Sequence, residues 1–151
     1  MLDAYDDLGD FLYVVSTWGL PALLAITLHE AAHGFVAALR GDGTAWHAGR
    51  VTLNPLKHID PIGTVILPGL FLLTGSPVMF GYAKAVPVDM RALRNPKRDM
   101  ALVAIAGPLT KILLAVIASL LAHLSGFPGE GIAGWIGQNL GHAITLNAAL
   151  A

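Results

Sequence analysis

The sequence predicts an all-α polytopic membrane protein with about three transmembrane helices, a re-entrant or broken apolar segment and a small interfacial β-hairpin or sheet. Three observations indicate this fold class. Of the 151 residues, 55% are hydrophobic and 13% are charged, whereas soluble globular proteins carry about 25% charged residues. Long apolar runs alternate with polar loops. The chain has no cysteine, which excludes disulfide scaffolds, thiolate metal sites and catalytic cysteines.

The first spanning helix is expected from Phe11 to about Leu39. This stretch is almost wholly apolar, interrupted by Pro21 and by a polar group at residues 29–33. At about 1.5 Å per residue, it is long enough to cross a hydrocarbon core of about 30 Å. The flank before it lacks the basic region of a signal peptide and is acidic instead, with Asp3, Asp6, Asp7 and Asp10. We therefore expect the helix to be retained.

The polar stretch of residues 40–60 predicts an interfacial hairpin. Residues 41–43 end the helix, and residues 49–53 alternate like a short strand before the Asn54-Pro55 turn. Residues 62–80 are apolar again but contain Pro and Gly breaks, which favour a bent or re-entrant segment.

The second half of the chain predicts two further spans. Residues 81–99 form the main polar loop, and residues 100–124 form the cleanest apolar span after the first helix. A turn over residues 126–131 leads to a weaker last span at residues 132–151. We expect one domain over residues 1–151, without internal repeats.

The distribution of basic residues predicts the orientation. The 81–99 loop is basic, with Lys84, Arg91, Arg94, Lys97 and Arg98, and the 40–60 hairpin adds Arg40, Arg50 and Lys57. The positive-inside rule then places the N-terminus outside and the 81–99 loop in the cytosol. The segment between these two loops must enter and leave by one face or cross twice. Nine Lys and Arg residues balance ten Asp and Glu residues, and no dense basic run indicates a nucleic-acid partner.

The residues His29, Glu30 and His33 match the pattern H-E-x-x-H. Two histidines four residues apart lie on one face of a helix, where both imidazoles can bind one Zn²⁺ at about 2.0–2.1 Å. Glu30 is then the expected general base for peptide hydrolysis. The alternative is an accidental spacing of packed side chains. Three ionisable residues in one turn of a membrane helix are costly and mark function by default, so we favour the metal site.

An ordered set of motifs beyond H-E-x-x-H resembles the compact bacterial and archaeal branch of the site-2 proteases, which are intramembrane zinc metalloproteases. The motifs occupy residues 49–64, 81–89, 95–100 and 106–108. The resemblance implies a polytopic α-helical metalloprotease core with one zinc, acting on a transmembrane protein substrate within or beside the lipid bilayer. It also implies a short sheet of residues 49–54 and 82–88 at the membrane surface, whose edge holds an unwound substrate by strand addition.

The chain departs from this family at two points. Members take their third zinc ligand from an Asp in a Leu-Asp-Gly motif on a later helix, but no Asp or Glu follows Glu130 in this chain. We therefore expect the third ligand to lie outside the 151 residues, as in a C-terminally truncated piece. Lys111 stands where members usually have an Asn that contacts substrate or the oxyanion. This lysine either snorkels toward water or faces the polar cavity.

Three polar residues are candidates for contacting substrate: Asn54, Lys111 and Asn147. His58 and Asp60 flank the interfacial turn, where an ordinary turn is the simpler explanation for both. His142 lies on the last predicted span, where hydrogen-bonded packing is as reasonable as a role in the site.

Three functions remain open from the sequence. The first is an intramembrane zinc endopeptidase. The second is a catalytically inactive relative that binds membrane segments without cleaving them, which the missing Asp and Lys111 favour. The third and weakest is a metal transporter that uses His29 and His33 as a relay, because a single metal motif offers no path through the membrane.

Overall fold

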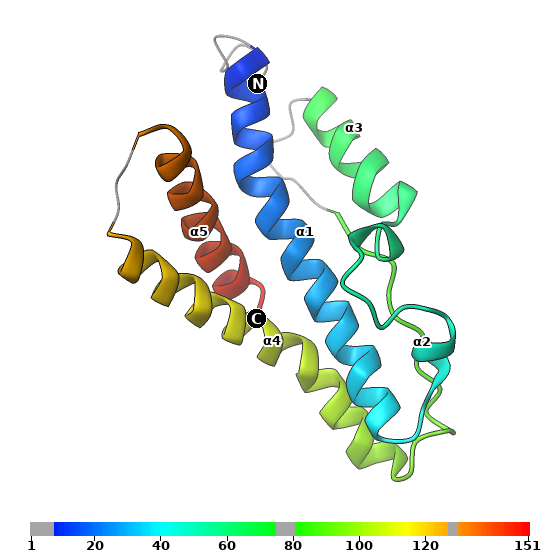
Figure 1. The fold of residues 1–151 in the computed structure, drawn as a ribbon. Coiled ribbons are helices and arrows are strands. Elements are labelled where there is room, and N and C mark those ends of the chain that lie inside the picture. Colours follow the sequence, from blue (N-terminus) through cyan, green and yellow to red (C-terminus); the bar gives the residue numbers. More distant parts are fainter. Residues whose placement is uncertain (1–7, 75–80, 127–129) are drawn as a thin grey trace.

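The computed structural model describes residues 8–74, 81–126 and 130–151, without the side chains of Pro68 and Leu72. Its elements in chain order are α1 (Leu8–Leu39), α2 (Thr44–His47), η2 (Pro55–Lys57), η3 (Pro61–Ile66), α3 (Leu67–Leu73), α4 (Pro96–Ser125) and α5 (Gly131–Ala149). Three helices, α1, α4 and α5, pack against one another. The short helix α3 packs against η3 and is drawn on the other side of α1 from α5 (Figure 1).

Two of the described helices, α1 and α4, are long and apolar enough to cross a membrane. With 32 and 30 residues, both exceed the roughly 20 residues that a bilayer requires. An exposed apolar row runs along α4, formed by Leu109, Leu113, Val116 and Leu120. Such a row would be costly in water, so this arrangement is consistent with a membrane protein. The predicted last span coincides with the 19-residue helix α5, which is not one of these two helices.

Small residues bring the helices close together. The residues that α1 buries are Thr17, Pro21, Ala25, Thr27, Ala31, Gly34 and Ala37. On α4, Ala106 and Gly107 are buried as well. Apolar side chains gain little by leaving lipid, so close backbone approach through small residues is the usual means of helix association in membranes.

Polar contacts join α5 to the first half of α1. The indole Nε1 of Trp135 donates to Ser16 Oγ at 2.9 Å. The ring of His142 lies 2.9 Å, through Nδ1, from the carbonyl oxygen of Thr17 and stacks on Trp18 with ring centroids 3.9 Å apart. His142 is therefore engaged in hydrogen-bonded packing between α5 and α1, which was one of the two explanations considered for it.

Contacts also join the C-terminal end of α1 to the N-terminal end of α4. The Arg94 amide donates to the carbonyl oxygen of Arg40 at 3.1 Å, and Arg40 Nε lies 4.0 Å from the buried carboxylate of Asp99. The same carboxylate accepts the Asn95 amide at 2.8 Å. The C-terminal end of α1 and the N-terminal end of α4 are thereby held together (Figure 1).

The β-hairpin predicted over residues 40–60 is not formed. Gly49 has a left-handed φ of +64°, and the Arg50 amide donates to the carbonyl oxygen of Ala45 at 2.9 Å. The backbone therefore turns where the alternating pattern predicted a strand. The His58 ring lies 3.1 Å from the Thr52 carbonyl oxygen, so the segment folds around a buried histidine instead of pairing with a second strand.

The sheet expected from residues 49–54 and 82–88 is also absent, and the described residues contain no strand. Instead, the Tyr82 amide donates to Gly63 O at 3.0 Å and the Lys84 amide donates to His58 O at 2.9 Å. The amides of Tyr82 and Lys84 are thus bonded to η3 and to the turn before it, not to the 49–54 segment.

The predicted break within residues 62–80 is found in the part that the structure describes. A six-residue π-helix, η3, precedes the short helix α3. Asp60 caps η3, with Oδ1 accepting the amides of Ile62 at 3.0 Å and Gly63 at 2.8 Å. Asp60 therefore has the turn-forming role that the sequence favoured. Residues 75–80 of the predicted segment lie outside the described residues.

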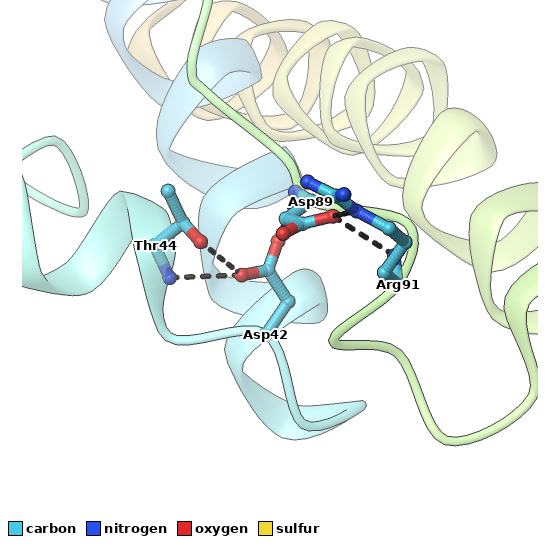
Figure 2. Close-up of polar contacts among 4 residues, drawn as sticks. All are labelled: Asp42, Thr44, Asp89 and Arg91. Atoms are coloured by element: carbon cyan, nitrogen blue, oxygen red, sulfur yellow. Dashed lines mark hydrogen bonds and ion pairs between the residues drawn. The ribbon is translucent and has the colours of Figure 1, made fainter.

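A carboxylate network joins the start of the 40–60 loop to the 81–95 loop (Figure 2). Asp42 is fully buried, accepts the Thr44 amide at 2.9 Å and accepts the Asp89 amide at 2.7 Å. Asp89 in turn accepts the Arg91 amide at 2.9 Å. Desolvation raises the pKa of Asp42, but the hydrogen bonds from Thr44 and Asp89 outweigh it and leave this pKa below its usual value.

Candidate functional site

The two histidines of the H-E-x-x-H pattern point toward one another from successive turns of α1. The Nε2 atoms of His29 and His33 are 3.0 Å apart, and the ring planes are nearly perpendicular at 88°. Two nitrogens at about 2.0–2.1 Å from one tetrahedral ion are separated by about 3.3 Å. The two Nε2 atoms are therefore close to the spacing that a shared metal ion needs.

The tautomer of His33 is fixed from the neighbouring helix. Its Nδ1 atom lies 2.6 Å from the carbonyl oxygen of Val103 on α4. A carbonyl can only accept, so Nδ1 carries the proton and the lone pair of Nε2 is left for another partner. The Nδ1 atom of His29 is buried and has no hydrogen-bond partner among the described residues.

Gly107 makes room for the imidazole pair. A Cβ atom at this position would lie 2.3 Å from His29 Cε1, 2.6 Å from His29 Nε2 and 2.4 Å from His33 Nε2. Because these distances are well below van der Waals contact, no other amino acid fits without displacing the rings. The Gly-Pro pair at residues 107 and 108 therefore lets α4 approach the histidines on α1.

The carboxylate of Glu30 is held by a distant segment of the chain. Its Oε2 atom accepts the amide of Val86 at 3.0 Å, across 56 positions of sequence. Within residues 8–74, 81–126 and 130–151, no third His, Cys, Asp or Glu joins the histidine pair to form a three-residue metal cluster. His29 and His33 thus offer two imidazole nitrogens, which are ligands that zinc accepts. Glu30 is the next residue after His29 on the same helix.

Lys111 lies two turns beyond Val103 on the α4 face that carries Gly107. Its Nζ atom donates to the carbonyl oxygen of Leu150 at 3.0 Å, just after the end of α5. It also interacts electrostatically with His29 and Glu30. The half-buried side chain therefore links α4 to α5.

The other two candidates for substrate contact are engaged elsewhere. Asn54 is exposed and caps η2, with Oδ1 accepting the Leu56 amide at 3.1 Å. Asn147 is buried on α5, where its Nδ2 donates to Ala143 O at 2.9 Å while its Oδ1 has no partner among the described residues. The contacts of these two side chains do not include His29 or His33.

Sequence reasoning missed two parts of the site. The first is the carbonyl group of Val103, which accepts from His33. Every residue has a backbone carbonyl, so the amino-acid sequence cannot indicate which one makes this contact. Gly34 follows directly after the motif, and a Cβ there would lie 3.0 Å from Val86 Cγ1 and 2.9 Å from Val51 Cγ2. A glycine at this place in an otherwise regular apolar helix is a usable signal of close packing.

Comparisons of the sequence with known proteins identify its relatives. The chain is 42% identical over 102 residues to the "Putative zinc metalloprotease YwhC" of Bacillus subtilis, a match that covers 68% of this chain and 43% of that protein. It is 33% identical over 109 residues to the "Putative zinc metalloprotease Rip2" of Mycolicibacterium smegmatis, covering 72% of this chain and 39% of that protein. The protein of the same name from Mycobacterium tuberculosis is 32% identical over 109 residues, with the same coverage.

The chain thus spans less than half the length of the curated relatives that it matches. No family profile matches it, and no solved structure does. The relatives are members of the site-2 protease family, and the matched region includes most of the chain at up to 42% identity. The chain belongs to the site-2 protease family.

Proposed function

We propose that the chain forms the histidine-bearing part of an intramembrane zinc metalloprotease that hydrolyses peptide bonds of transmembrane proteins. The observation that carries the proposal is the convergence of the Nε2 atoms of His29 and His33 at 3.0 Å. The carbonyl of Val103 orients one ring, and the missing side chain of Gly107 leaves space for both. The names of the relatives support zinc as the metal.

In this proposal His29 and His33 would hold the zinc. Zinc, when bound, would polarise a carbonyl group and make water more acidic. Glu30 accepts a proton from the attacking water at its carboxylate and passes it to the amine that leaves when the peptide C–N bond breaks. The oxygen of water ends in the new carboxylate of the product.

We further propose that substrate approaches along the 82–88 segment. The amides of Tyr82 and Lys84 are already bonded on one side, and the amide of Val86 points to Glu30. In this proposal the segment is extended, so that Ala83 and Ala85, which alternate with these residues, present their backbone groups on the other side. An unwound substrate can add there as a strand, next to the proposed general base. Unwinding is required because a helix shields its own peptide bonds.

For the orientation, we propose an outside N-terminus and a cytosolic 81–99 loop in a multi-pass cell-membrane protein. Arg40 at the end of α1 and Asp99 at the start of α4 are 4.0 Å apart. This proximity supports placing the loop after α1 and the loop before α4 on the same side of the membrane. The basic residues of both loops support the cytosolic side.

The test is cleavage of a transmembrane reporter by the protein reconstituted in lipid vesicles with zinc. The variant Glu30→Gln is expected to lower the cleavage rate about 10²–10⁴-fold, with zinc still bound. Glu130→Gln removes a carboxylate from the exposed start of α5 and is the matched control, expected to cleave like the wild type. Wild-type cleavage by the Glu30→Gln variant would refute the proposed mechanism.

The second candidate function is a catalytically inactive relative that binds membrane segments. Lys111 favours it, because a cation that interacts with both His29 and Glu30 opposes the binding of another cation nearby. In vesicles with saturating zinc, this alternative predicts reporter binding without product. The protease proposal predicts product.

A further inference from the structure

Val86 contacts α1 at two points beside the histidine motif. Its amide donates to Glu30 Oε2 at 3.0 Å. Its side chain packs on Gly34, one helical turn further along the same face, where a Cβ atom would lie 3.0 Å from Val86 Cγ1. One residue of a distant segment is thus fixed to α1 through both its backbone and its side chain.

The segment that carries Val86 is itself tied down on both sides. Before Val86, the Lys84 amide donates to His58 O at 2.9 Å. After it, the Asp89 amide donates to the buried carboxylate of Asp42 at 2.7 Å. Figure 2 shows these two residues next to one another. Neither of these two hydrogen bonds involves Glu30. They can therefore fix the position of the Val86 amide independently of the Glu30 side chain.

We infer that Val86 is a positioning residue that sets the place of the Glu30 carboxylate relative to the imidazoles of His29 and His33. This inference rests on the proposed function of Glu30. A glutamate side chain has three rotatable bonds, and a fixed donor selects the rotamers that reach it. Hydrogen bonds to a charged acceptor are among the stronger ones in proteins, so a single backbone amide is sufficient for this selection.

The arrangement has a consequence for substrate binding. The backbone side proposed for substrate belongs to Ala83 and Ala85, which directly precede the residue that holds Glu30. A peptide that joins this side is therefore aligned with the carboxylate through neighbouring residues of one segment, and a shift of the segment moves both together. Gly34 is needed because any larger residue would push Val86 away from α1.

Amide hydrogen exchange of the purified protein in detergent tests the hydrogen bond without reference to activity. In Glu30→Ala the Val86 amide loses its acceptor, so its exchange is expected to quicken about tenfold or more. Glu30→Gln keeps a side-chain carbonyl acceptor and is expected to stay within about threefold of the wild type. The amides of Tyr82 and Lys84, bonded to other partners, serve as internal controls.

A second variant keeps the test decisive if Glu30→Ala does not fold. Gly34→Ala leaves Glu30 intact but displaces Val86, so it too is expected to quicken exchange at Val86. It is also expected to lower the cleavage rate about tenfold or more while zinc affinity stays within about threefold. Gly19→Ala, in the same helix with nothing within 4 Å of the added Cβ, is the matched control and is expected to change none of these quantities.

Unchanged exchange at Val86 in both Glu30→Ala and Gly34→Ala would overturn the inference. Equal quickening at Tyr82, Lys84 and Val86 would also overturn it, because the segment would then be loosened as a whole. If the wild-type protein cleaved no reporter, the proposed function would fail, but the exchange measurements would still decide whether Val86 holds Glu30.

Discussion

The Nδ1 atom of His33 on α1 donates to the carbonyl oxygen of Val103 on α4 at 2.6 Å. This hydrogen bond makes the second long helix part of the histidine site. One turn further along α4, Gly107 lies against both imidazoles. The site therefore depends on how closely α1 and α4 approach, and not only on the spacing of residues within α1.

The first prediction concerns Gly107→Ala. The added Cβ would meet imidazole atoms at 2.3–2.6 Å, so the rings must move and zinc affinity is expected to fall about 10–100-fold, as for other losses of ligand support. Zinc binding in competition with a chelator measures this. An alanine in a helix interior is intrinsically more favourable than glycine by up to about 1 kcal/mol, so any loss must come from the clash.

The control for this substitution is Gly141→Ala on α5, where an added Cβ has nothing within 4 Å. It is expected to leave zinc affinity unchanged. Equal zinc affinity in Gly107→Ala and the wild type would show that the histidine pair does not depend on the approach of α4.

The second prediction concerns Lys111, whose ammonium donates to the carbonyl oxygen of Leu150 near the end of α5. Lys111→Met removes this contact at a helix C-terminus, which is worth about 0.3–1 kcal/mol. It also removes a cation that interacts with His29 and Glu30. We therefore expect slightly lower thermal stability together with higher zinc affinity, measured by unfolding in detergent and by chelator competition.

Lys111→Arg is the matched variant because it keeps the positive charge and is expected to keep the wild-type zinc affinity. If Lys111→Met bound zinc no more tightly than Lys111→Arg, the charge of this residue would have no influence on the metal site.

The parts of the site that the sequence predicted are those set by local geometry. A spacing of four residues on a helix brings His29 and His33 together wherever the helix lies. The contact between Glu30 and Val86 joins residues 56 positions apart, and neither residue type indicates it. Their proximity depends on the path of the connecting loops, which periodicity does not encode.

The wrong part of the fold prediction has a local cause. Residues 49–53 have the alternation of a strand, but the left-handed Gly49 and the turn back to Ala45 remove the partner that a strand needs. The long helices were predicted well, since apolar runs of 30 residues have few other structures available in a membrane.

The third prediction concerns pH. The pKa of Asp42 is lowered in the folded protein because the hydrogen bonds from Thr44 and Asp89 outweigh desolvation. A lowered folded-state pKa gives stability that is present above the unfolded pKa of about 3.9 and is lost as the pH falls through the folded value. The unfolding temperature of the wild type is therefore expected to drop below about pH 4, with Asp42 contributing to the drop.

Asp42→Asn replaces one carboxylate oxygen by an amide donor, which faces the donor groups of Thr44 or Asp89. Breaking a buried hydrogen bond to a charged group costs about 1–3 kcal/mol, so the variant is expected to be less stable at pH 7 and to have a flatter dependence between about pH 2 and pH 5. An unchanged pH profile would mean that Asp42 keeps its ordinary pKa in the folded protein.

The fourth prediction concerns the contact between α1 and α5. Trp135 Nε1 donates to Ser16 Oγ at 2.9 Å, and both side chains belong to helices packed against one another. Trp135→Phe and Ser16→Ala each remove this hydrogen bond. The double variant is therefore expected to lose less unfolding free energy than the sum of the losses of the two single variants, because the same bond is counted twice in that sum. The expected coupling is about 0.5–1.5 kcal/mol, measured by unfolding in detergent.

Trp46→Phe is the control for the loss of an indole, because Trp46 is 58% exposed on the short helix α2. Combined with Ser16→Ala, it should give additive effects within about 0.5 kcal/mol. Interhelical hydrogen bonds add to the packing of small residues in membranes, so the contact between α5 and α1 is expected to weaken when this bond is removed. Additivity of Trp135→Phe with Ser16→Ala would show that the bond does not hold α5 in place, and that packing around His142 and Trp18 is sufficient.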